Sequence, residues 1–416
     1  MKKIVVAITA ASYSGNKGAA AMLQSSISQL HKRYGDQLQI NLMSVYPKED
    51  REQLPFDFIK VVPCTPKQLL FLAFPLAILY WLLKWCPPFR WLLEKNHIIK
   101  AYKDTDLVID EAGISFVDSR GFVMNTYAFV SVTVPMLVGT SVVKYSQAMG
   151  TFKKFTNRTL AKIALPKLKL ICARGQGTYD NLKGIGIETN VVLCADGAFT
   201  MPDDIDVDIM VNEICAKDTF YNDNVVGLSI SSVVEKKCKK LKIDYATIMV
   251  EFIDYLNKQG YHVLLIANAA RINSSKPRNN DLLIGDKIYE GVRNKEMVRW
   301  YHKEMTAEEI RAYLGKCRVL VASRFHAMIG ALEKKVPVLL VGWSHKYQEV
   351  LDMFELGQYA IDFSKLDSQT LSEEFERFIK QEVNILKQMD IHYDKVMKSS
   401  YRNIELISEV LDQSVK

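Results

Sequence analysis

The stretch RVLVASRFHAMIGALEKKVPVLLVG, residues 318–342, decides the fold class of this chain. It opens with Arg318–Ala322, a short and largely apolar run of the kind that becomes a buried parallel strand. Residues 327–335 then have helical character, Pro337 ends that helix, and Val338–Val341 predicts a second strand. A strand, a helix and a second strand in this order form the repeating unit of a doubly wound α/β sheet.

Three polar side chains, Ser323, Arg324 and His326, follow the first of these strands. Open α/β sheets bind ligands at the edge where their strands end. A guanidinium there can hold a carboxylate or a phosphate through two parallel hydrogen bonds, and an imidazole at a helix start can move a proton near neutral pH. We therefore predict an anion-binding site with an acid–base group. The alternative is a helix-capping serine, an arginine paired to a nearby carboxylate and an ordinary histidine.

Strand and helix patterns alternate along most of the remaining chain, which predicts doubly wound parallel sheets in both halves. The other predicted strands are Ile4–Ile8, Gln39–Ser44, Leu107–Ile109, Val142–Ser146, Leu170–Ala173, Val191–Cys194, Val225–Ile230 and His262–Ala267. The other predicted helices are Ala19–Tyr34, Tyr245–Lys258, Glu308–Leu314, Leu371–Lys387 and Tyr401–Leu411.

The chain has 416 residues, more than one hydrophobic core usually serves, so two domains are expected. An acidic break that contains a proline, Met201–Asp208, interrupts the alternation. We therefore predict an N-terminal domain over residues 1–210 and a C-terminal domain over residues 211–416. The C-terminal domain includes the terminal helices, one of which can pack back across the cleft.

Composition excludes several classes of protein. The net charge of +7 is spread over the chain, and the compact basic run at residues 236–240 lacks interleaved aromatic residues, so it indicates a solvated helix face and no nucleic-acid partner. The seven cysteines are scattered without a Cys-x-x-Cys pair, which argues against a disulfide framework or a zinc site. The first apolar run, Ile4–Ile8, is too short for a signal peptide, so a cytoplasmic location is expected.

Four blocks of the sequence resemble the polysaccharide pyruvyl transferases. Residues 323–347, SRFHAMIGALEKKVPVLLVGWSHKY, are similar to the C-terminal signature of that family: Ser-Arg-aliphatic-His-Ala, then Pro-hydrophobic, then a lysine before an aromatic residue. Gly15–Met22 is similar to the loop that enters the first helix, residues 173–187 to a mid-chain block, and residues 194–199 to an Asp-Pro-Ala-Phe block. The resemblance implies a GT-B-like pair of Rossmann-like domains that face each other across a cleft.

The chain departs from the family pattern at three places. Gly175 and Gln176 stand where an acidic residue usually follows the arginine of the mid-chain block, and Gly197 replaces the proline of the Asp-Pro-Ala-Phe block. Many members carry a glycine run after a strand where this chain reads Asp-Glu-Ala-Gly-Ile-Ser, residues 110–115.

The resemblance implies transfer of the pyruvyl group of phosphoenolpyruvate onto two hydroxyls of a sugar, which forms a ketal. Arg324 and Arg174 are the candidate clamps for the donor, with Lys346 as a third positive charge and Ser323 beside them. His326 is the candidate acid and base. We expect Arg324 to disfavour its imidazolium form and a bound dianionic donor to restore it. The scheme needs no metal and no cofactor.

The acceptor side offers two weaker pairs of candidates. Asn16 and Lys17 lie on a loop that enters a helix, where backbone amides favour an anion; they can equally be turn and cap residues. Asp110 and Glu111 end a strand and could orient or deprotonate an acceptor hydroxyl, or they could cap the next turn. Asp196 is more typical of a turn residue.

One segment, the apolar insertion at residues 67–95, breaks the alternation. Its run of about 15 apolar residues is shorter than the roughly 20 that span a bilayer. Trp81, Trp85 and Trp91 lie here, three of the five tryptophans, with lysines and an arginine around them. This composition suits a helix in one leaflet at the inner face of the cell membrane, near a polyprenyl-linked or polymeric sugar acceptor. The alternative is a helical hairpin buried in an oligomer interface or under a domain.

Two other functions remain open from sequence. A GT-B glycosyltransferase would share the architecture and the cationic C-terminal site, but it would bind a nucleoside diphosphate and not phosphoenolpyruvate. A non-catalytic, membrane-attached assembly protein would keep the fold and respond to neither. The acceptor sugar, the stereochemistry of the ketal and the oligomeric state are left open by the sequence.

Overall fold

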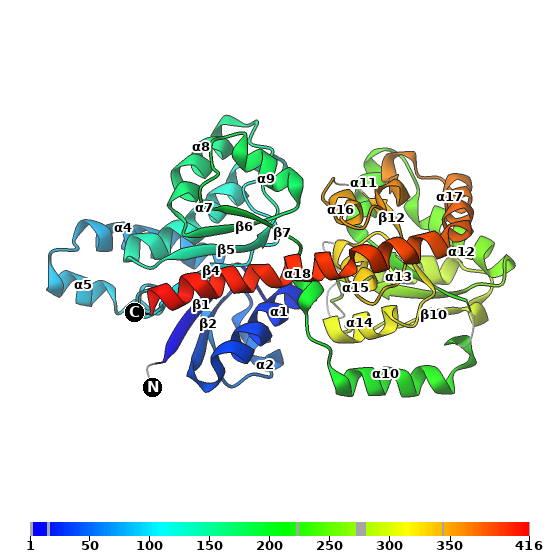
Figure 1. Cartoon of the computed structure of the whole chain (residues 1–416), viewed down its shortest axis with the longest axis horizontal. Helices are drawn as coiled ribbons and strands as arrows, with labels where there is room; N and C mark the ends of the chain where they lie inside the picture. The colour runs from blue at the N-terminus through cyan, green and yellow to red at the C-terminus, as the bar shows by residue number, and fades with distance from the viewer. Residues whose placement is uncertain (1–2, 15–16, 222–223, 272–279, 343–344, 416) are drawn as a thin grey trace. The chain divides into compact units, whose positions relative to one another are not determined.

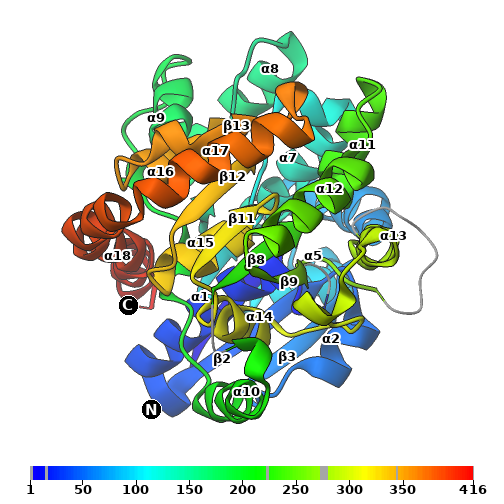
Figure 2. The ribbon, with the colours of Figure 1, turned by 90° about the vertical axis from the view of Figure 1, so that its right-hand side faces the viewer.

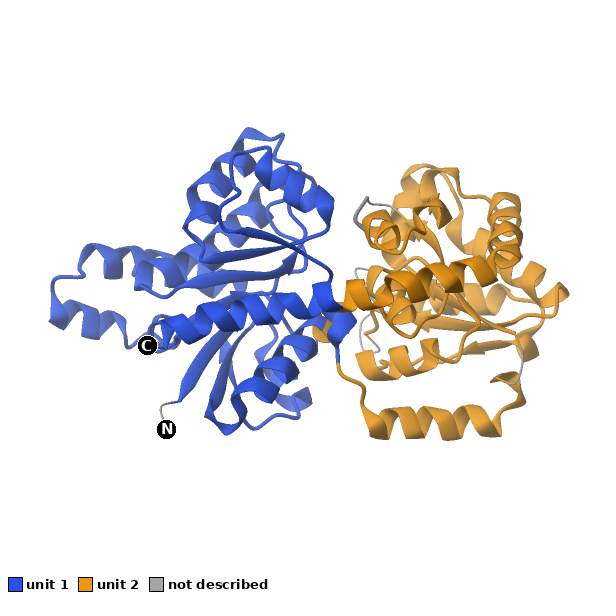
Figure 3. Ribbon diagram, in the orientation of Figure 1, with its two compact units in different colours: residues 1–15, 22–201, 398–416 blue, residues 16–21, 202–397 orange. Residues whose placement is uncertain are grey.

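The computed structural model describes residues 3–14, 17–221, 224–271, 280–342 and 345–415, except the side chains of residues 345 and 346. The chain divides into two compact units (Figure 3). Unit 1 comprises residues 1–15, 22–201 and 398–416, and unit 2 comprises residues 16–21 and 202–397.

Unit 1 is built on a seven-stranded parallel sheet of order β3-β2-β1-β4-β5-β6-β7 (Figure 1). Its strands are β1 (Ile4–Thr9), β2 (Leu38–Ser44), β3 (Ile59–Pro63), β4 (Leu107–Asp110), β5 (Val142–Gln147), β6 (Leu170–Arg174) and β7 (Val191–Cys194). Side chains of the central strands, such as Val6, Ile109 and Val143, are fully buried and form the core. Burial on both faces explains their near-continuous apolar sequences.

Helices connect the strands of unit 1. They are α1 (Lys17–Tyr34), whose first turn falls in unit 2, α2 (Pro47–Gln53), α3 (Pro66–Gln68), α4 (Phe74–Leu82), α5 (Pro87–Leu93), α6 (His97–Lys103), α7 (Gly121–Val138), α8 (Phe155–Ala164) and α9 (Gln176–Lys183). By length and composition alone α7 could cross a membrane; it packs against β4 and β5, and Val130, Val132 and Val134 are buried.

Unit 2 is built on a six-stranded parallel sheet of order β10-β9-β8-β11-β12-β13. Figure 2 shows this sheet with α12 on one face and α15 on the other. Its strands are β8 (Val225–Ile230), β9 (His262–Ala267), β10 (Val298–Trp300), β11 (Val319–Ala322), β12 (Val338–Gly342) and β13 (Ala360–Asp362). Its helices are α10 (Ile205–Lys217), α11 (Ser232–Lys240), α12 (Tyr245–Lys258), α13 (Leu282–Gly291), α14 (Ala307–Leu314), α15 (Phe325–Glu333), α16 (His345–Asp352), α17 (Ser368–Lys380) and the first half of α18 (Glu382–Ser414).

These two sheets confirm the predicted α/β class with two doubly wound domains. The boundary, however, lies between Met201 and Pro202 rather than near residue 210. The reason is that α10 packs against α14, and that Asp203 forms ion pairs with Arg311 and Lys334, both at 2.6 Å.

The assignment of all of residues 211–416 to the second domain also needs correction. Residues 398–416, which include the second half of α18, belong to unit 1. There Ser400 donates a hydrogen bond to the Asp196 carbonyl oxygen (2.7 Å), and the Asn403 amide donates to the Ala195 carbonyl oxygen (2.9 Å). These bonds hold the helix end against the loop that follows β7.

Candidate active site

The predicted arginine of unit 2 lies where β11 ends and α15 begins. Arg324 is extended (φ −118°, ψ 132°), and Phe325 starts the helix. Its Nη2 donates to the Asp281 carboxylate and, at 3.2 Å, to the Ser232 hydroxyl. Ser323 is buried, and its hydroxyl accepts a hydrogen bond from Tyr245 (3.1 Å). The guanidinium is therefore anchored at one end on the carboxyl edge of the sheet.

Asp281 is the carboxylate that positions this arginine. It is fully buried, and it also accepts hydrogen bonds from the backbone amides of Ser232 (2.9 Å) and Ala269 (3.0 Å). Two amides and a guanidinium compensate its buried charge. Asp281 could not be singled out from the sequence, because a single aspartate ahead of a helix is typical of an ordinary turn.

The other end of the guanidinium remains available. The Nε of Arg324 is buried and has no hydrogen-bond partner among the described residues. A buried N–H without an acceptor costs about 1–3 kcal/mol, which an incoming anion would offset. Arg324 is paired to a carboxylate, Asp281, as the alternative interpretation of the sequence expected. It also keeps one donor, Nε, that the pair does not use.

His326 lies in the first turn of α15 against the first turn of α1, which belongs to the same unit. A Cβ atom added to Gly18 would lie 1.9 Å from the imidazole Nδ1. Only a glycine therefore leaves room for the histidine at this position. The contact joins the first and the last block of the sequence that carry the family resemblance.

The N-terminus of α1 carries the positive end of the helix dipole. Lys17 is half-buried and immediately precedes Gly18. The unpaired amides at a helix N-terminus favour an anion, so the place beside His326 suits a phosphate or a carboxylate. Asn16 lies outside the described residues. Lys346 follows β12 at the start of α16, as does His345, and both side chains lie outside the described part of the chain.

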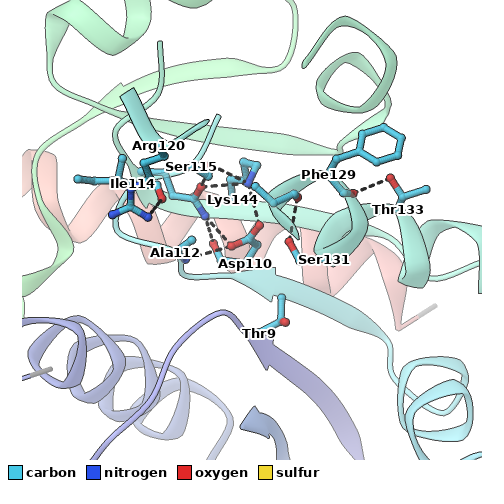
Figure 4. Close-up of polar contacts among 12 residues, drawn as sticks. Thr9, Asp110, Ala112, Ile114, Ser115, Arg120, Phe129, Ser131, Thr133 and Lys144 are labelled. Carbon is cyan, nitrogen blue, oxygen red and sulfur yellow. Dashed lines mark hydrogen bonds and ion pairs between the residues drawn. The ribbon is translucent and has the colours of Figure 1, made fainter. Parts of the chain in front are cut away.

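In unit 1, Asp110 and Lys144 form a buried ion pair on neighbouring strands (Figure 4). The Lys144 ammonium donates to Asp110 Oδ2 (2.7 Å), Gln147 Oε1 (3.0 Å) and Ser115 Oγ (3.3 Å). Asp110 Oδ1 accepts from the Gln147 amide (2.8 Å) and from the Ala112 backbone (3.0 Å). Both carboxylate oxygens of Asp110 therefore already accept hydrogen bonds, from the turn that follows Asp110 and from the neighbouring strand β5.

Arg174 ends β6, and its guanidinium is also held by hydrogen bonds within unit 1. Its Nη1 donates to Asp196 (2.7 Å), its Nη2 donates to the Gly113 carbonyl oxygen (2.7 Å), and the side chain is buried. Arg120, which the sequence analysis did not single out, donates to the Ile114 carbonyl oxygen (3.0 Å). Partial desolvation lowers the pKa of the Arg120 guanidinium, and the charge of Arg174 lowers it further. Two arginines thus gather at this edge of unit 1.

Glu111 differs from its neighbour Asp110. Neither of its carboxyl oxygens has a hydrogen-bond partner among the described residues, and the side chain is buried. Burial raises the pKa of Glu111 to about 8; the nearby Ser26 hydroxyl opposes this shift and the charge of Asp110 adds to it. Ser26 donates its own hydrogen bond to the Leu23 carbonyl oxygen (3.0 Å). Glu111 is therefore a buried carboxylic acid that loses its proton near physiological pH.

We predict that Glu111→Gln increases stability at high pH. The folded pKa lies above the usual 4.5, so the native protein binds the extra proton and loses stability as the pH rises from about 4.5 to 8. At about 1.4 kcal/mol per pKa unit, the variant should exceed the wild type by roughly 4–5 kcal/mol at pH 8 and match it near pH 4.5. Urea denaturation at several pH values measures this difference; a difference independent of pH would contradict the raised pKa.

Solved structures with the same fold include two proteins whose structures contain UDP. The chain is 12% identical to Anabaena HepE, solved with UDP, with a TM-score of 0.57 over 99% of this chain and 100% of that one. It is 12% identical to S. aureus MnaA, also solved with UDP, with a TM-score of 0.58 over 94% and 91%. At this identity the likeness establishes the GT-B-like fold alone.

Sequence comparison identifies the family. The chain is 21% identical to the amylovoran biosynthesis protein AmsJ of Erwinia amylovora over 273 residues, which is 64% of this chain and 63% of AmsJ. The alignment thus spans less than two thirds of that relative. The family model for polysaccharide pyruvyl transferases matches residues 16–345, and this range contains Gly18, Arg324 and His326. The chain belongs to the polysaccharide pyruvyl transferase family.

Proposed function

We propose that this protein transfers the pyruvyl group of phosphoenolpyruvate to two hydroxyls of a polyprenyl-linked sugar, which forms a pyruvate ketal during surface polysaccharide biosynthesis. The reaction would take place in the cytoplasm, at the inner face of the cell membrane. The proposal rests on two features of unit 2: the buried Nε of Arg324 has no hydrogen-bond partner among the described residues, and His326 lies against the first turn of α1. Together they offer a small anion cationic hydrogen-bond donors and a group that carries a proton.

The donor carries a carboxylate and a phosphate, and each needs hydrogen-bond donors. Arg324 would take one group through its unused edge, while Asp281 holds the guanidinium in place. The first turn of α1, with Lys17, would take the other group through backbone amides and the lysine charge. A bound dianion beside His326 favours the imidazolium, which is the form needed to donate a proton.

The transfer balances with this one acid–base group. His326 donates a proton to the methylene carbon of phosphoenolpyruvate, which becomes a methyl group, and the central carbon gains oxocarbenium character. One sugar hydroxyl adds to that carbon and gives its proton back to His326, and the bond to phosphate then breaks. The second hydroxyl adds to the same carbon, and its proton goes to the released phosphate. The products are the cyclic ketal and inorganic phosphate.

On the acceptor side, we assign the hydroxyl contact to Glu111 rather than Asp110. The oxygens of Asp110 are taken by Lys144, Gln147 and Ala112, whereas those of Glu111 have no partner among the described residues. A carboxyl group with a pKa of about 8 can accept a proton from an acceptor hydroxyl once the pH exceeds that value, and it can donate a hydrogen bond below it.

A thermal-shift measurement with phosphoenolpyruvate, UDP and GDP tests the proposal. A ligand at one hundred times its dissociation constant adds about 2.7 kcal/mol to stability, so phosphoenolpyruvate should raise the melting temperature by several degrees. A response to UDP or GDP alone would point to a glycosyltransferase that uses a nucleotide sugar. No response to any of the three would favour a non-catalytic assembly protein.

We predict that Arg324→Lys lowers the affinity for phosphoenolpyruvate about 10- to 100-fold, because lysine keeps the charge but loses the planar fork that serves Asp281 and the donor together. The matched control is Arg318→Lys, which makes the same change at an arginine paired to Glu382 on the surface of unit 2. Titration calorimetry measures both variants. Unchanged binding in Arg324→Lys would remove this arginine from the donor site.

A further inference from the structure

The apolar hairpin, Pro66–Leu93, carries an exposed apolar surface in unit 1. It consists of α3, a π-helical turn at Leu69–Ala73, α4 and α5. One row of its side chains is buried against α7 and the rest of the core: Leu69, Ala73, Ala77 and Tyr80. Ten other apolar side chains are exposed: Phe71, Leu72, Ile78, Leu79, Trp81, Leu82, Trp85, Phe89, Trp91 and Leu92.

Cations frame the aromatic side chains of the hairpin. The Lys84 ammonium lies 4.5 Å from the centre of the Trp85 ring, and the Lys95 ammonium lies 4.0 Å from that of Trp91. Residues 66–95 contain four cations and one acid, Glu94, which leaves three net positive charges. Tryptophan with lysine beside it is the composition that rests at the boundary between lipid chains and headgroups.

A basic groove lies at the base of the hairpin. It encloses about 620 Å³, and its lining includes the cations Arg51, Lys60 and Lys100, the imidazole of His97 and one carboxylate, Asp104. Its walls are β3 and α3, which lead into the hairpin, and α6, which leads out of it. Arg51, Lys60 and Lys100 form no side-chain hydrogen bond or ion pair with another described residue. Three cations against one carboxylate leave the groove net positive, and an anion would relieve the repulsion among the cations.

We propose that the apolar hairpin and the basic groove together form a membrane-docking surface. The exposed side chains of the hairpin enter the interface of one leaflet, and the groove binds the phosphate of an anionic lipid. The same hairpin links both contacts, because β3–α3 and α6 form the walls of the groove. This inference concerns the surface alone and holds whatever reaction the protein performs.

Charge selects a lipid surface over a second copy of the chain. A symmetric contact between two hairpins would bring Lys67 and Lys84 of one copy, and Lys95 just beyond, toward the same residues of the other, with Glu94 as the sole acid of residues 66–95. An anionic leaflet complements both the hairpin and the groove. The chain connection between the groove walls and the exposed apolar hairpin favours a lipid phosphate over a free phosphate ion.

The experiment is co-sedimentation with vesicles of phosphatidylcholine, with and without phosphatidylglycerol. The full-length wild type should bind both and bind the anionic vesicles more tightly. Replacement of Trp81, Leu82 and Trp85 by serine should weaken binding to both by roughly 100-fold, because the apolar contact is lost. These side chains are exposed, so the variant should fold and turn over a water-soluble acceptor analogue at an unchanged rate. The matched control is Phe122→Ser/Val123→Ser, which alters exposed apolar residues of α7 and should bind as the wild type does.

The groove is tested by Arg51→Ser/Lys60→Ser/Lys100→Ser. Binding to anionic vesicles should fall by about 100-fold, at roughly fivefold for each charge, while binding to phosphatidylcholine alone stays the same. The control Lys236→Ser/Lys239→Ser/Lys240→Ser removes the same charge from an exposed face of α11 and should change little.

Three results would overturn the proposal. The first is an equal loss of anionic binding in the groove variant and the α11 control, because the groove would then have no special role. The second is wild-type vesicle binding by the hairpin variant together with a smaller oligomer in gel filtration, which would assign the surface to a second copy. The third is binding of inorganic phosphate to the groove without any effect of the groove variant on vesicles.

Discussion

Replacement of His326 by glutamine is expected to slow pyruvyl transfer by about 10²–10⁴, the usual contribution of a positioned acid–base group. Glutamine has a polar side chain of similar reach but cannot carry a proton at neutral pH. Steady-state kinetics measures the loss, and titration with phosphoenolpyruvate should find donor binding much less affected. The wild-type rate should show a limb with an apparent pKa in the range of histidine, and the limb should be absent in His326→Gln. Near-normal turnover would leave His326 with a purely structural role.

Gly18→Ala supplies an independent test of the same site. It keeps the histidine but places a methyl group within 1.9 Å of where Nδ1 lies, so the imidazole must turn away. We expect a loss of turnover comparable to that of His326→Gln. The control is Gly35→Ala, at the exposed end of α1, where an added Cβ atom meets nothing within 4 Å. Gly35 has a positive φ (54°), so this control should lower stability but leave turnover intact.

Replacement of Lys144 by methionine is expected to destabilise the protein by about 3–5 kcal/mol, because it leaves the buried Asp110 carboxylate without its counter-charge. Ser115 and Gln147 also lose a shared partner. The free energy of unfolding from urea denaturation measures the loss. The same substitution at Lys103, which pairs with Glu94 on the surface, should cost less than about 1 kcal/mol.

The double variant Asp110→Asn/Lys144→Met identifies the cause of that loss. It removes both charges, so no buried ion is left uncompensated, and it should be more stable than Lys144→Met alone. A double variant that is less stable than the single one would mean that the hydrogen bonds of Asp110, rather than its charge, support the sheet.

The central strands could be predicted from sequence because their side chains are buried on both faces. All ten predicted strands occur in the structure, with ends that differ by at most one residue. The three strands that escaped prediction, β3, β10 and β13, lie at sheet edges. Their side chains are mostly half-exposed, so they lack the apolar runs of the central strands. The predicted helix Leu371–Lys387 proved to be two helices, α17 and α18, which are separated at Gln381.

The candidate site was accessible to sequence only in part. Arg324 and His326 could be singled out because a strand, a turn and a helix start follow one another within a few residues. Lys144 gave a signal that was not used: a lysine inside an apolar strand is typical of a buried ion pair, and its partner Asp110 ends the adjacent strand. Glu111 and Asp110 looked equivalent in sequence, and only their surroundings separate an occupied carboxylate from one without partners.

The sequence by itself determined which segments become central strands and where the Ser-Arg-Phe-His motif falls, because apolar periodicity and helix-start chemistry act between near neighbours. Tertiary structure alone decided that Asp281 holds Arg324 and that Gly18 lies against His326. It also decided that one row of the hairpin is buried while its tryptophans are exposed. The physical reason is that these contacts join residues far apart in the chain. Burial raises the pKa of Glu111 and keeps the Nε donor of Arg324 away from water, and it exists only once the sheets have packed.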